Sequence, residues 1–451
     1  MPTPPSATAR DEPVIRDRGD ACPGALRLHA ADDGYLARVR IPGGLLTGRQ
    51  ASVLALAADR FGDGHLELTS RGNVQLRGLA EGCGTGLAEL LDGAGLLPAP
   101  GHERVRNVVA TPLSGIGSSG RPHVTSWVAE LDRLLCTSTR ATALSGRFLF
   151  AIDDGRGDVA ALDPDVTLLG GPRGRVLVRL GAARGAVEVD AADAPRAALL
   201  AAEYFLDSAD AAGTRAWRVS ELPAAHALEE GEFALRLGSA GIAADVLPEV
   251  AWPYAPPPRP WGPGTGDQTA LCVLPPLGRL TADQWRVLVD VAAGGEGGGE
   301  AGGEGDGELR VTPWRSIVLP GASTRRPVDG YARLVAAGLS VAPDGPWESV
   351  TACTGRPGCA KALSDVRADA RAVVDAGGAE GEAQAGTAVA PVHWSGCERR
   401  CGHPRGTAWV DLVATPDGYR LDGRPVPSHE LAQAVADARS QPRVSEDAVK
   451  K

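Results

Sequence analysis

Lysine is almost missing from this 451-residue chain. Only Lys361, Lys450 and Lys451 occur, so 43 of the 46 basic residues are arginine. The abundance of Ala and Gly favours a bias in codon usage as the cause. Whatever the cause, an anion-binding site here must use guanidinium groups, whose planar forks bind carboxylates through two hydrogen bonds.

Long hydrophobic runs and an excess of positive charge are missing too. No stretch approaches about 18 uninterrupted apolar residues, and the polar, Pro-rich start lacks the apolar segment of a secretory signal. We therefore expect a cytoplasmic protein without membrane contact. The formal net charge of −10 argues against broad binding of nucleic acid, which requires a basic field. The 43% of hydrophobic residues suffice for two or more ordinary domains.

Cysteine is scarce, with eight in the chain. In a reducing compartment such thiols bind metals or stay free. Four are scattered and are expected to be small core or surface residues: Cys22, Cys83, Cys136 and Cys272. The other four form two groups, in CTGRPGC at 353–359 and SGCERRCGHP at 395–404.

These two groups predict a metal or cluster site. Four thiolates on glycine-containing loops can surround a tetrahedral zinc or bind the four irons of a cubane. The spacing favours iron, because structural zinc usually has shorter spacings between its cysteines. Two disulfides and a structural zinc remain alternatives.

A helix is expected to begin at Cys359. Apolar residues recur at helical spacing after it, namely Leu363, Val366, Ala370 and Val373. Such a helix would direct its free N–H groups at the sulfurs and stabilise negative charge there.

An internal repeat organises the rest of the chain. Residues 274–288 match 40–54 at a shift of 234, and 309–319 match 66–76 at a shift of 243. The extra length falls in 293–307, AGGEGGGEAGGEGDG, which has no need to fold. The shared order of strand, turn, Leu-Thr helix start and Thr-bearing strand predicts a duplicated unit.

The first copy predicts a βαββα order, with a helix over 48–58 that has Thr47 as its N-cap. Its other elements are strands at 35–41 and within 65–78 and a helix at 85–93. Beyond it we expect helices at 124–139 and 194–207, strands at 147–152 and 175–180, a hairpin over 409–421 and a helix at 429–438.

These elements predict seven segments. They are a disordered tail (1–21), a first half-domain (22–98), a first α/β domain (99–246), a Pro-rich connector (247–264), a second half-domain (265–342), a second α/β domain (343–440) and a tail (441–451).

Four motifs together resemble the sulfite and nitrite reductase superfamily, in the family order and over roughly residues 25–435. They are TSRGNVQLRG at 69–78, RNVVATP at 106–112, ACTGRPGC at 352–359 and SGCERRCG at 395–402. The resemblance implies an α+β fold of two pseudo-twofold halves, each a ferredoxin-like half-domain with an α/β domain. It also implies a [4Fe-4S] cluster on Cys353, Cys359, Cys397 and Cys401, beside a site for an acidic tetrapyrrole.

Within that superfamily the chain looks most like the precorrin-3B synthases of aerobic cobalamin biosynthesis. It is short for a reductase, and Gly402-His403-Pro404 follows the last cysteine as in the synthases. The anion-binding set also departs from the reductases. Arg71 and Arg106 match the positions at which the reductases hold the oxyanion. The reductases also have a Lys-x-Lys pair, but the corresponding residues here, 147–149, are Arg-Phe-Leu.

The resemblance implies a monooxygenase that converts precorrin-3A to the hydroxy-lactone precorrin-3B. It would use O2 and electrons from an external donor, an NADH-linked reductase or a ferredoxin. Six arginines are candidate clamps for the substrate's carboxylates: Arg71, Arg77, Arg104, Arg106, Arg121 and Arg147. The alternative is that about half of them are solvated surface residues.

His403 is the candidate catalytic residue. It could ligate a mononuclear non-haem iron, donate to a cluster sulfide or bind a carboxylate. Alternatively it is a loop histidine hydrogen-bonded to backbone. Two other functions stay open for the chain: a sirohaem-dependent sulfite or nitrite reductase, and a non-catalytic iron-sulfur carrier or metal-stapled binding protein.

Overall fold

A computed structural model describes most of the chain. The described residues are 22–116, 120–259, 270–294, 307–322, 327–343, 345–380, 390–404 and 408–441. The expected tail 1–21, nearly all of the tail 441–451 and most of the insertion 293–307 lie outside them. The chain forms two compact units: unit 1 is mainly Pro98–Gly115 and Ser119–Pro256, and unit 2 is mainly Pro23–Leu97 and Pro257–Lys451. The expected domain limits stay predictions.

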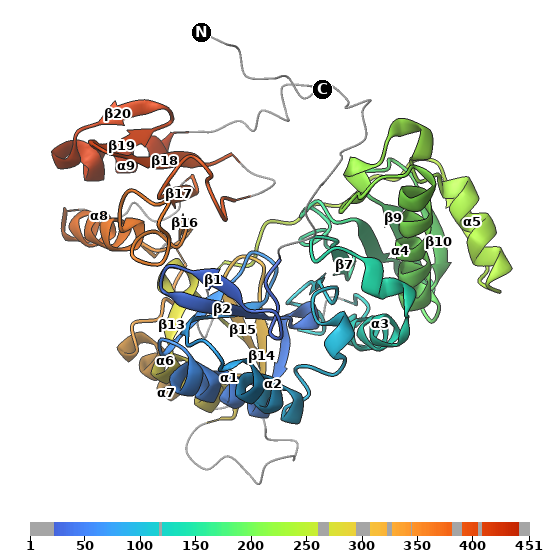
Figure 1. Ribbon diagram of the computed structural model, residues 1–451, viewed down its shortest axis with the longest axis horizontal. Coiled ribbons are helices and arrows are strands. Elements are labelled where there is room, and N and C mark those ends of the chain that lie inside the picture. Colours follow the sequence, from blue (N-terminus) through green and yellow to red (C-terminus); the bar gives the residue numbers. More distant parts are fainter. Residues whose placement is uncertain are drawn as a thin grey trace. The chain divides into compact units, whose positions relative to one another are not determined.

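Unit 1 is built on one sheet of order β11-β10-β9-β8-β7-β6 (Figure 1). Strands β6, β7 and β8 are parallel to one another, and β9, β10 and β11 continue the sheet in antiparallel pairs. The strands are β6 (Val108–Ala110), β7 (Phe150–Asp153), β8 (Val166–Gly170), β9 (Arg175–Leu180), β10 (Ala186–Asp190) and β11 (Asp245–Leu247), and the helices are α3 (Thr125–Thr137), α4 (Ala194–Ala211) and α5 (Glu230–Ser239). The expected strands β7 and β9 and helices α3 and α4 are confirmed, whereas β8 and β10 were not anticipated.

Unit 2 contains two sheets that exchange strands between the repeats. Their orders are β1-β2-β5-β4-β13 and β12-β15-β14-β3. The bounds are β1 (His29–Ala31), β2 (Gly34–Val39), β3 (Leu45–Thr47), β4 (His65–Leu68), β5 (Val74–Leu79), β12 (Ala270–Val273), β13 (Arg279–Thr281), β14 (Glu308–Val311) and β15 (Ile317–Pro320). Strand β13 of the second repeat pairs with β4, and β3 of the first pairs with β14. The two repeats therefore share a single hydrophobic core.

The helices of unit 2 confirm the repeat at the level of single residues. Helices α1 (Gly48–Phe61) and α6 (Ala282–Ala292) both begin with a capping box, made by Thr47 and Gln50 in α1 and by Thr281 and Gln284 in α6. Helices α2 (Gly84–Gly93) and α7 (Pro327–Ala336) follow the β-hairpins of the two repeats. The expected βαββα order is thus correct.

A third sheet of unit 2 has the order β16-β17-β18-β19-β20. The strands are β16 (Val350–Ala352), β17 (Val392–Ser395), β18 (Val410–Thr415), β19 (Gly418–Leu421) and β20 (Arg424–Val426), with helices α8 (Val366–Glu380) and α9 (Leu431–Ser440). As in unit 1, three parallel strands are followed by antiparallel ones. The duplication thus includes the α/β sheets, which confirms the predicted pseudo-twofold α+β architecture. The expected hairpin and last helix are also confirmed.

The helix expected to begin at Cys359 is wrong, because α8 begins at Val366. The Asp365 side chain accepts a hydrogen bond from the Ala368 N–H at 3.1 Å, the geometry of an N-cap. Before it, the chain turns to bond with other loop segments, since Leu363 N–H donates to the Gly396 carbonyl at 2.8 Å. No helix N-terminus therefore faces the sulfurs at Cys359.

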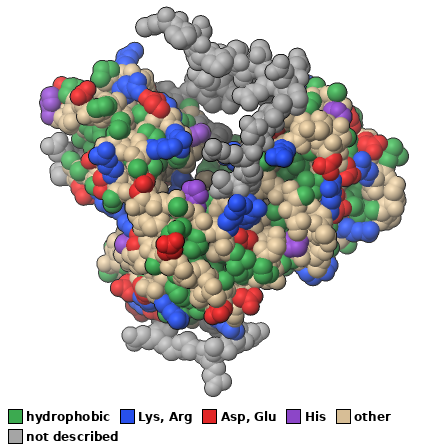
Figure 2. Space-filling view, in the orientation of Figure 1, with side chains coloured by type: hydrophobic (Ala, Val, Ile, Leu, Met, Phe, Trp, Pro, Cys, Tyr) green, Lys and Arg blue, Asp and Glu red, His purple; other side chains and the backbone are tan. Residues whose placement is uncertain are grey.

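The surface carries charges of both signs. Acidic and basic side chains are interspersed over the face shown in Figure 2, among the residues that the structure describes. Within the same ranges, no helix is long and apolar enough to cross a bilayer.

Candidate metal centre

The two cysteine loops follow neighbouring parallel strands. Cys353 comes directly after β16, and Cys397 lies two residues after β17. The carboxyl ends of adjacent parallel strands meet at one edge of a sheet, where α/β proteins bind ligands. The two loops are joined there, because the Gly396 N–H donates to Cys353 Sγ at 3.1 Å. The fold thus explains why motifs about 40 residues apart converge.

The four thiols influence one another. All eight cysteines of the chain are free, so neither disulfide of the alternative is present. Burial raises the pKa of the Cys353 thiol, and so do the charges of Cys397 and Cys359, while backbone N–H groups of Gly396 and Gly355 lower it. Burial likewise raises the pKa of Cys401, and the other three thiols raise it further. Cys353 and Cys401 are therefore each within electrostatic range of other thiols of the two loops.

The cysteine side chains are not arranged as ligands of a single metal ion. Within the described ranges, no three His, Cys, Asp or Glu side chains are close enough to hold one metal ion. A cubane takes one thiolate on each of four irons and needs its sulfurs spread around a larger volume. A Cβ atom at Gly396 would lie 2.6 Å from the Ala362 Cβ and 3.5 Å from Cys353 Sγ, so the glycine leaves the room that the loops need.

The first cysteine loop is held by a buried ion pair of the first repeat. Arg77 on β5 donates two hydrogen bonds of 2.8 Å to Asp33, which lies in the turn between β1 and β2. The same guanidinium donates to the Gly358 carbonyl at 2.8 Å, and the Ala360 N–H donates to the Asp32 carboxylate. Arg77 is 5% exposed, so this pair acts in a poorly solvated place.

The second cysteine loop is held by His393 on β17. This fully buried ring contacts the Cys401 carbonyl through Nε2 at 3.1 Å and the Thr351 hydroxyl through Nδ1 at 2.8 Å. Burial, followed by the charge of Arg315, lowers the pKa of His393 to about 3. The ring is therefore neutral, and because a carbonyl only accepts, Nε2 carries the proton and Nδ1 accepts from Thr351.

His403 lies in the same loop and is exposed. Its Nδ1 donates to the Pro404 carbonyl at 2.8 Å, and its ring stacks on Trp409 with centroids 5.4 Å apart. This is the backbone hydrogen bond expected if His403 is only a loop histidine. It leaves Nε2 as the ring nitrogen that could face a ligand.

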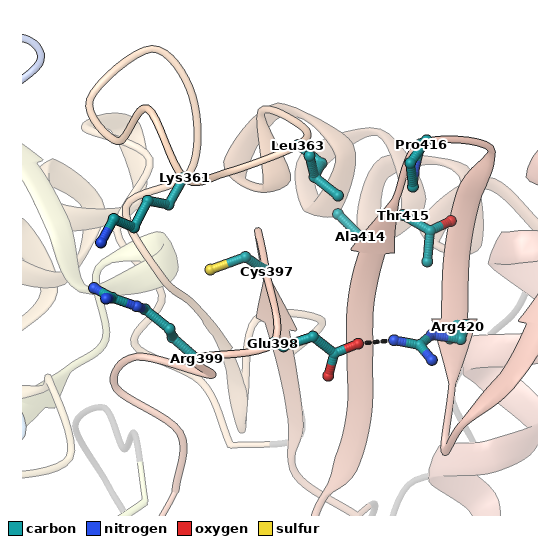
Figure 3. A pocket seen from close by; sticks show the side chains of 9 residues that line it. All are labelled: Lys361, Leu363, Cys397, Glu398, Arg399, Ala414, Thr415, Pro416 and Arg420. Atoms are coloured by element: carbon teal, nitrogen blue, oxygen red, sulfur yellow. Dashed lines mark ion pairs between the residues drawn. The ribbon is translucent and has the colours of Figure 1, made fainter.

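A cavity of about 380 Å³ adjoins Cys397 (Figure 3). The side chains of Lys361 and Arg399 lie beside the Cys397 sulfur at one side of the cavity, and Glu398 forms an ion pair with Arg420 at another.

The six candidate arginines differ in their surroundings. Arg71 and Arg77 lie in unit 2 and the other four in unit 1. Arg106 is buried and holds Asp132 with two hydrogen bonds of 2.6 and 2.7 Å, so its fork, like that of Arg77, is already used by a protein carboxylate. Arg147 is exposed and lies 4.6 Å above the Trp217 ring. Arg121 is exposed, and Arg71 and Arg104 are half-buried.

Sequence reasoning missed three residues of this centre. His393 could have been found as a histidine four residues before Cys397 in an apolar run. Lys361 lies two residues after Cys359 but was noted only as one of three lysines. Arg315 could have been found from the repeat, because it occupies the position that corresponds to Gly72 of the first repeat.

Comparison with known proteins agrees with this architecture. The family model of the nitrite/sulfite reductase ferredoxin-like half domain matches residues 29–90 and 263–326, one copy in each repeat. The chain therefore contains two half domains of the nitrite/sulfite reductase ferredoxin-like type. It is 26% identical over 437 residues to a precorrin-3B synthase from Sinorhizobium sp, which covers 90% of this chain and 83% of that protein.

Nitrite reductases of the superfamily are similarly close. A ferredoxin–nitrite reductase from Leptolyngbya laminosa is 26% identical over 86% of this chain and 78% of its own. The solved structure of the Mycobacterium tuberculosis NirA protein matches with a TM-score of 0.68 over 88% of this chain and 79% of its own, at 18% identity, which shows the fold.

Proposed function

We propose that this chain is a precorrin-3B synthase-like monooxygenase of aerobic cobalamin biosynthesis. It would convert precorrin-3A to the hydroxy-lactone precorrin-3B with O2 and electrons from an external donor. The proposal includes a [4Fe-4S] cluster on Cys353, Cys359, Cys397 and Cys401. The cluster, when bound, supplies one-electron transfer, which proteins leave to cofactors.

The observation that carries the proposal is residues 147–149. By the resemblance, a reductase has two lysines here. In this chain Arg147 is directed onto Trp217, and Leu149 is 3% exposed in the core. The segment thus offers one cation where a small oxyanion would need two, which suits a larger substrate.

The role of the protein is to bind and orient a polycarboxylate ring. The proposed carboxylate ligands are the six candidate arginines, Arg71, Arg77, Arg104, Arg106, Arg121 and Arg147, each forked pair contributing roughly 1.5 to 3 kcal/mol where partly desolvated. Arg77 and Arg106 also hold the carboxylates of Asp33 and Asp132. His403 is proposed to present Nε2 to a mononuclear iron or to a substrate carboxylate.

A sirohaem-dependent nitrite reductase is the second candidate, favoured by the equal identity to the Leptolyngbya protein. Protein purified without oxygen separates the two. Incubation with precorrin-3A, O2 and a reductant should yield an oxygenated lactone by mass, with no sirohaem bands in the isolated protein. Stoichiometric sirohaem together with consumption of nitrite or sulfite would establish the reductase instead. Zinc in place of iron would exclude both enzymes, and failure to bind any tetrapyrrole would favour a non-catalytic carrier.

A further inference from the structure

The hairpin bends of the two repeats have the same hydrogen bonds. In the first, Thr69 N–H donates to the Asn73 carbonyl at 2.9 Å and Gly72 N–H to the Thr69 carbonyl at 3.1 Å. In the second, Thr312 N–H donates to the Ser316 carbonyl at 2.9 Å and Arg315 N–H to the Thr312 carbonyl at 3.1 Å. Arg315 is therefore the structural equivalent of Gly72.

The two residues also share a left-handed backbone. The φ angle is 66° at Gly72 and 60° at Arg315. For a residue with a Cβ this conformation costs about 1–2 kcal/mol, which glycine does not incur. A strained non-glycine residue at a position that suits glycine indicates that its side chain has a use.

The Arg315 side chain extends to the second cysteine loop. Its Nη2 donates to the Gly402 carbonyl at 3.0 Å, one residue after Cys401. Two glycines clear its path: a Cβ at Gly278 would lie 2.7 Å from the Arg315 Cδ, and a Cβ at Gly402 would lie 3.0 Å from its Nη2. The carbonyls of Cys401 and Gly402 thus receive donors from His393 and Arg315, respectively.

Arg315 has no acidic partner of its own. In the part of the chain that the structure describes, no carboxylate lies within ion-pair distance of it. Glu67 exerts an attraction on Arg315, but its carboxylate is 2.6 Å from Arg367 and 3.7 Å from Arg279. Burial lowers the pKa of Arg315 to about 10, so the group stays charged at neutral pH. The side chain is half-buried, and a cation there is stabilised by a nearby opposite charge.

We propose that the counter-charge of Arg315 is the anionic, thiolate-ligated cluster, and that Arg315 raises the reduction potential of that cluster. The inference rests on the cluster assigned under the proposed function. Four thiolates give a [4Fe-4S] centre a net negative charge, and reduction adds one more electron. A nearby fixed cation therefore stabilises the reduced form, and local charge is among the factors that set such potentials.

Three variants of the full chain separate charge from backbone strain. Arg315→Gln removes the charge and keeps the strained backbone, Arg315→Gly removes both, and Arg315→Lys keeps the charge. The midpoint potential is measured by a redox titration of anaerobically purified protein, followed by visible absorbance and electron paramagnetic resonance. Arg333→Gln is the matched control, since Arg333 on α7 is paired with Asp290 on α6.

The expected shift is on the order of tenfold in the reduction equilibrium, about 59 mV for a one-electron couple. The potential should fall in Arg315→Gln and Arg315→Gly and stay near wild type in Arg315→Lys and Arg333→Gln. Arg315→Gly should in addition be no less stable to heat, because its backbone strain is relieved. An unchanged potential in both the Gln and Gly variants that retain full iron would overturn this inference alone, whereas wild-type protein without iron would overturn the cluster assignment as well.

Discussion

The indole Nε1 of Trp285 on α6 donates a 2.8 Å hydrogen bond to the backbone carbonyl of Ala51 on α1. The shift of 234 makes these two residues equivalents in the two repeats. Both are fully buried, so the large side chain of one repeat packs over the small side chain of the other. The duplicated unit is therefore closed by an asymmetric contact between two otherwise matching helices.

Removing this indole should loosen the core shared by the repeats. Trp285→Ala is expected to cost about 3–5 kcal/mol through lost burial and a cavity. Trp285→Phe keeps most of the volume and should cost about 0.5–1.5 kcal/mol beyond the effect of its smaller size, because the hydrogen bond to the Ala51 carbonyl is lost. Hydrogen exchange of α1 and α6 measures both effects. Trp252→Ala, at a half-buried site of unit 1, should leave that exchange unchanged, and equal exchange in all three variants would contradict the prediction.

The cysteine assignment predicts a clear difference between two thiols. Cys397→Ser should lose the broad visible absorbance of the cluster, most of the bound iron and turnover, because one iron loses its thiolate. Cys136→Ser removes a half-buried thiol of α3 in unit 1 and should change none of these. Iron and acid-labile sulfide assays with the visible spectrum provide the measurement. Full iron content in Cys397→Ser would remove this residue from the ligand set.

Features could be predicted from the sequence when the interacting residues are close together along the chain. The helix starts at Thr47 and Thr281 follow from local signals, since each capping box lies within four residues. The cysteine motifs and the repeat were equally visible. The Asp33–Arg77–Gly358 connection was not, because Arg77 and Gly358 are 281 residues apart and their contact depends on tertiary packing.

Local signals also misled in one place. The helical spacing after Cys359 is real, but it belongs to a helix that begins only at Val366. The hydrogen bond between Leu363 and Gly396 competes with helix formation in the intervening residues. His393 and Arg315 were missed for a similar reason, since each acts on the backbone of a loop that the fold brings to it.

The Arg77–Asp33 pair predicts how firmly the first cysteine loop is held. Arg77→Ala leaves the half-buried Asp33 carboxylate and the Gly358 carbonyl without their donors, a change that costs about 1–3 kcal/mol. We expect the variant to release iron several-fold faster to a chelator, followed by loss of visible absorbance. Arg106→Ala breaks a similar buried pair with Asp132 in unit 1 and should destabilise that unit without changing iron release. Equal release rates in both variants would show that the pair does not support the centre.

Stability of unit 1 should fall as pH rises toward neutrality. Burial first, and the charge of Asp153 second, raise the pKa of Asp158 from its ordinary value of 3.8 to about 7. The folded state therefore holds a proton that the unfolded state has lost over the range between about pH 4 and pH 7, so stability decreases with pH across that window. Burial also raises the pKa of Asp165, to about 6, which acts in the same direction.

Substitution tests the contribution of Asp158 directly. In Asp158→Asn the thermal midpoint should depend less on pH between 5 and 8 than in the wild type, because the titrating group is gone. Glu130→Gln is the control: this exposed carboxylate is hydrogen-bonded to Arg133, which lowers its pKa, so its removal should leave the slope intact. A wild-type midpoint that rises from pH 5 to pH 8 would contradict the assignment.

We expect an acidic electron donor to dock at the cavity beside Cys397. Lys361 and Arg399 place two cations next to a proposed cluster ligand in a chain whose net charge is −10. Complementary charge speeds the association of partners and is screened by salt. The double variant Lys361→Glu and Arg399→Glu should therefore slow reduction of the cluster by an acidic ferredoxin about tenfold or more at low salt.

Arg424→Glu, on the exposed strand β20, is the control. Reduction by an uncharged small-molecule dye should proceed at the same rate in all variants. If the double variant were reduced by ferredoxin at the wild-type rate across salt concentrations, electrons would enter elsewhere.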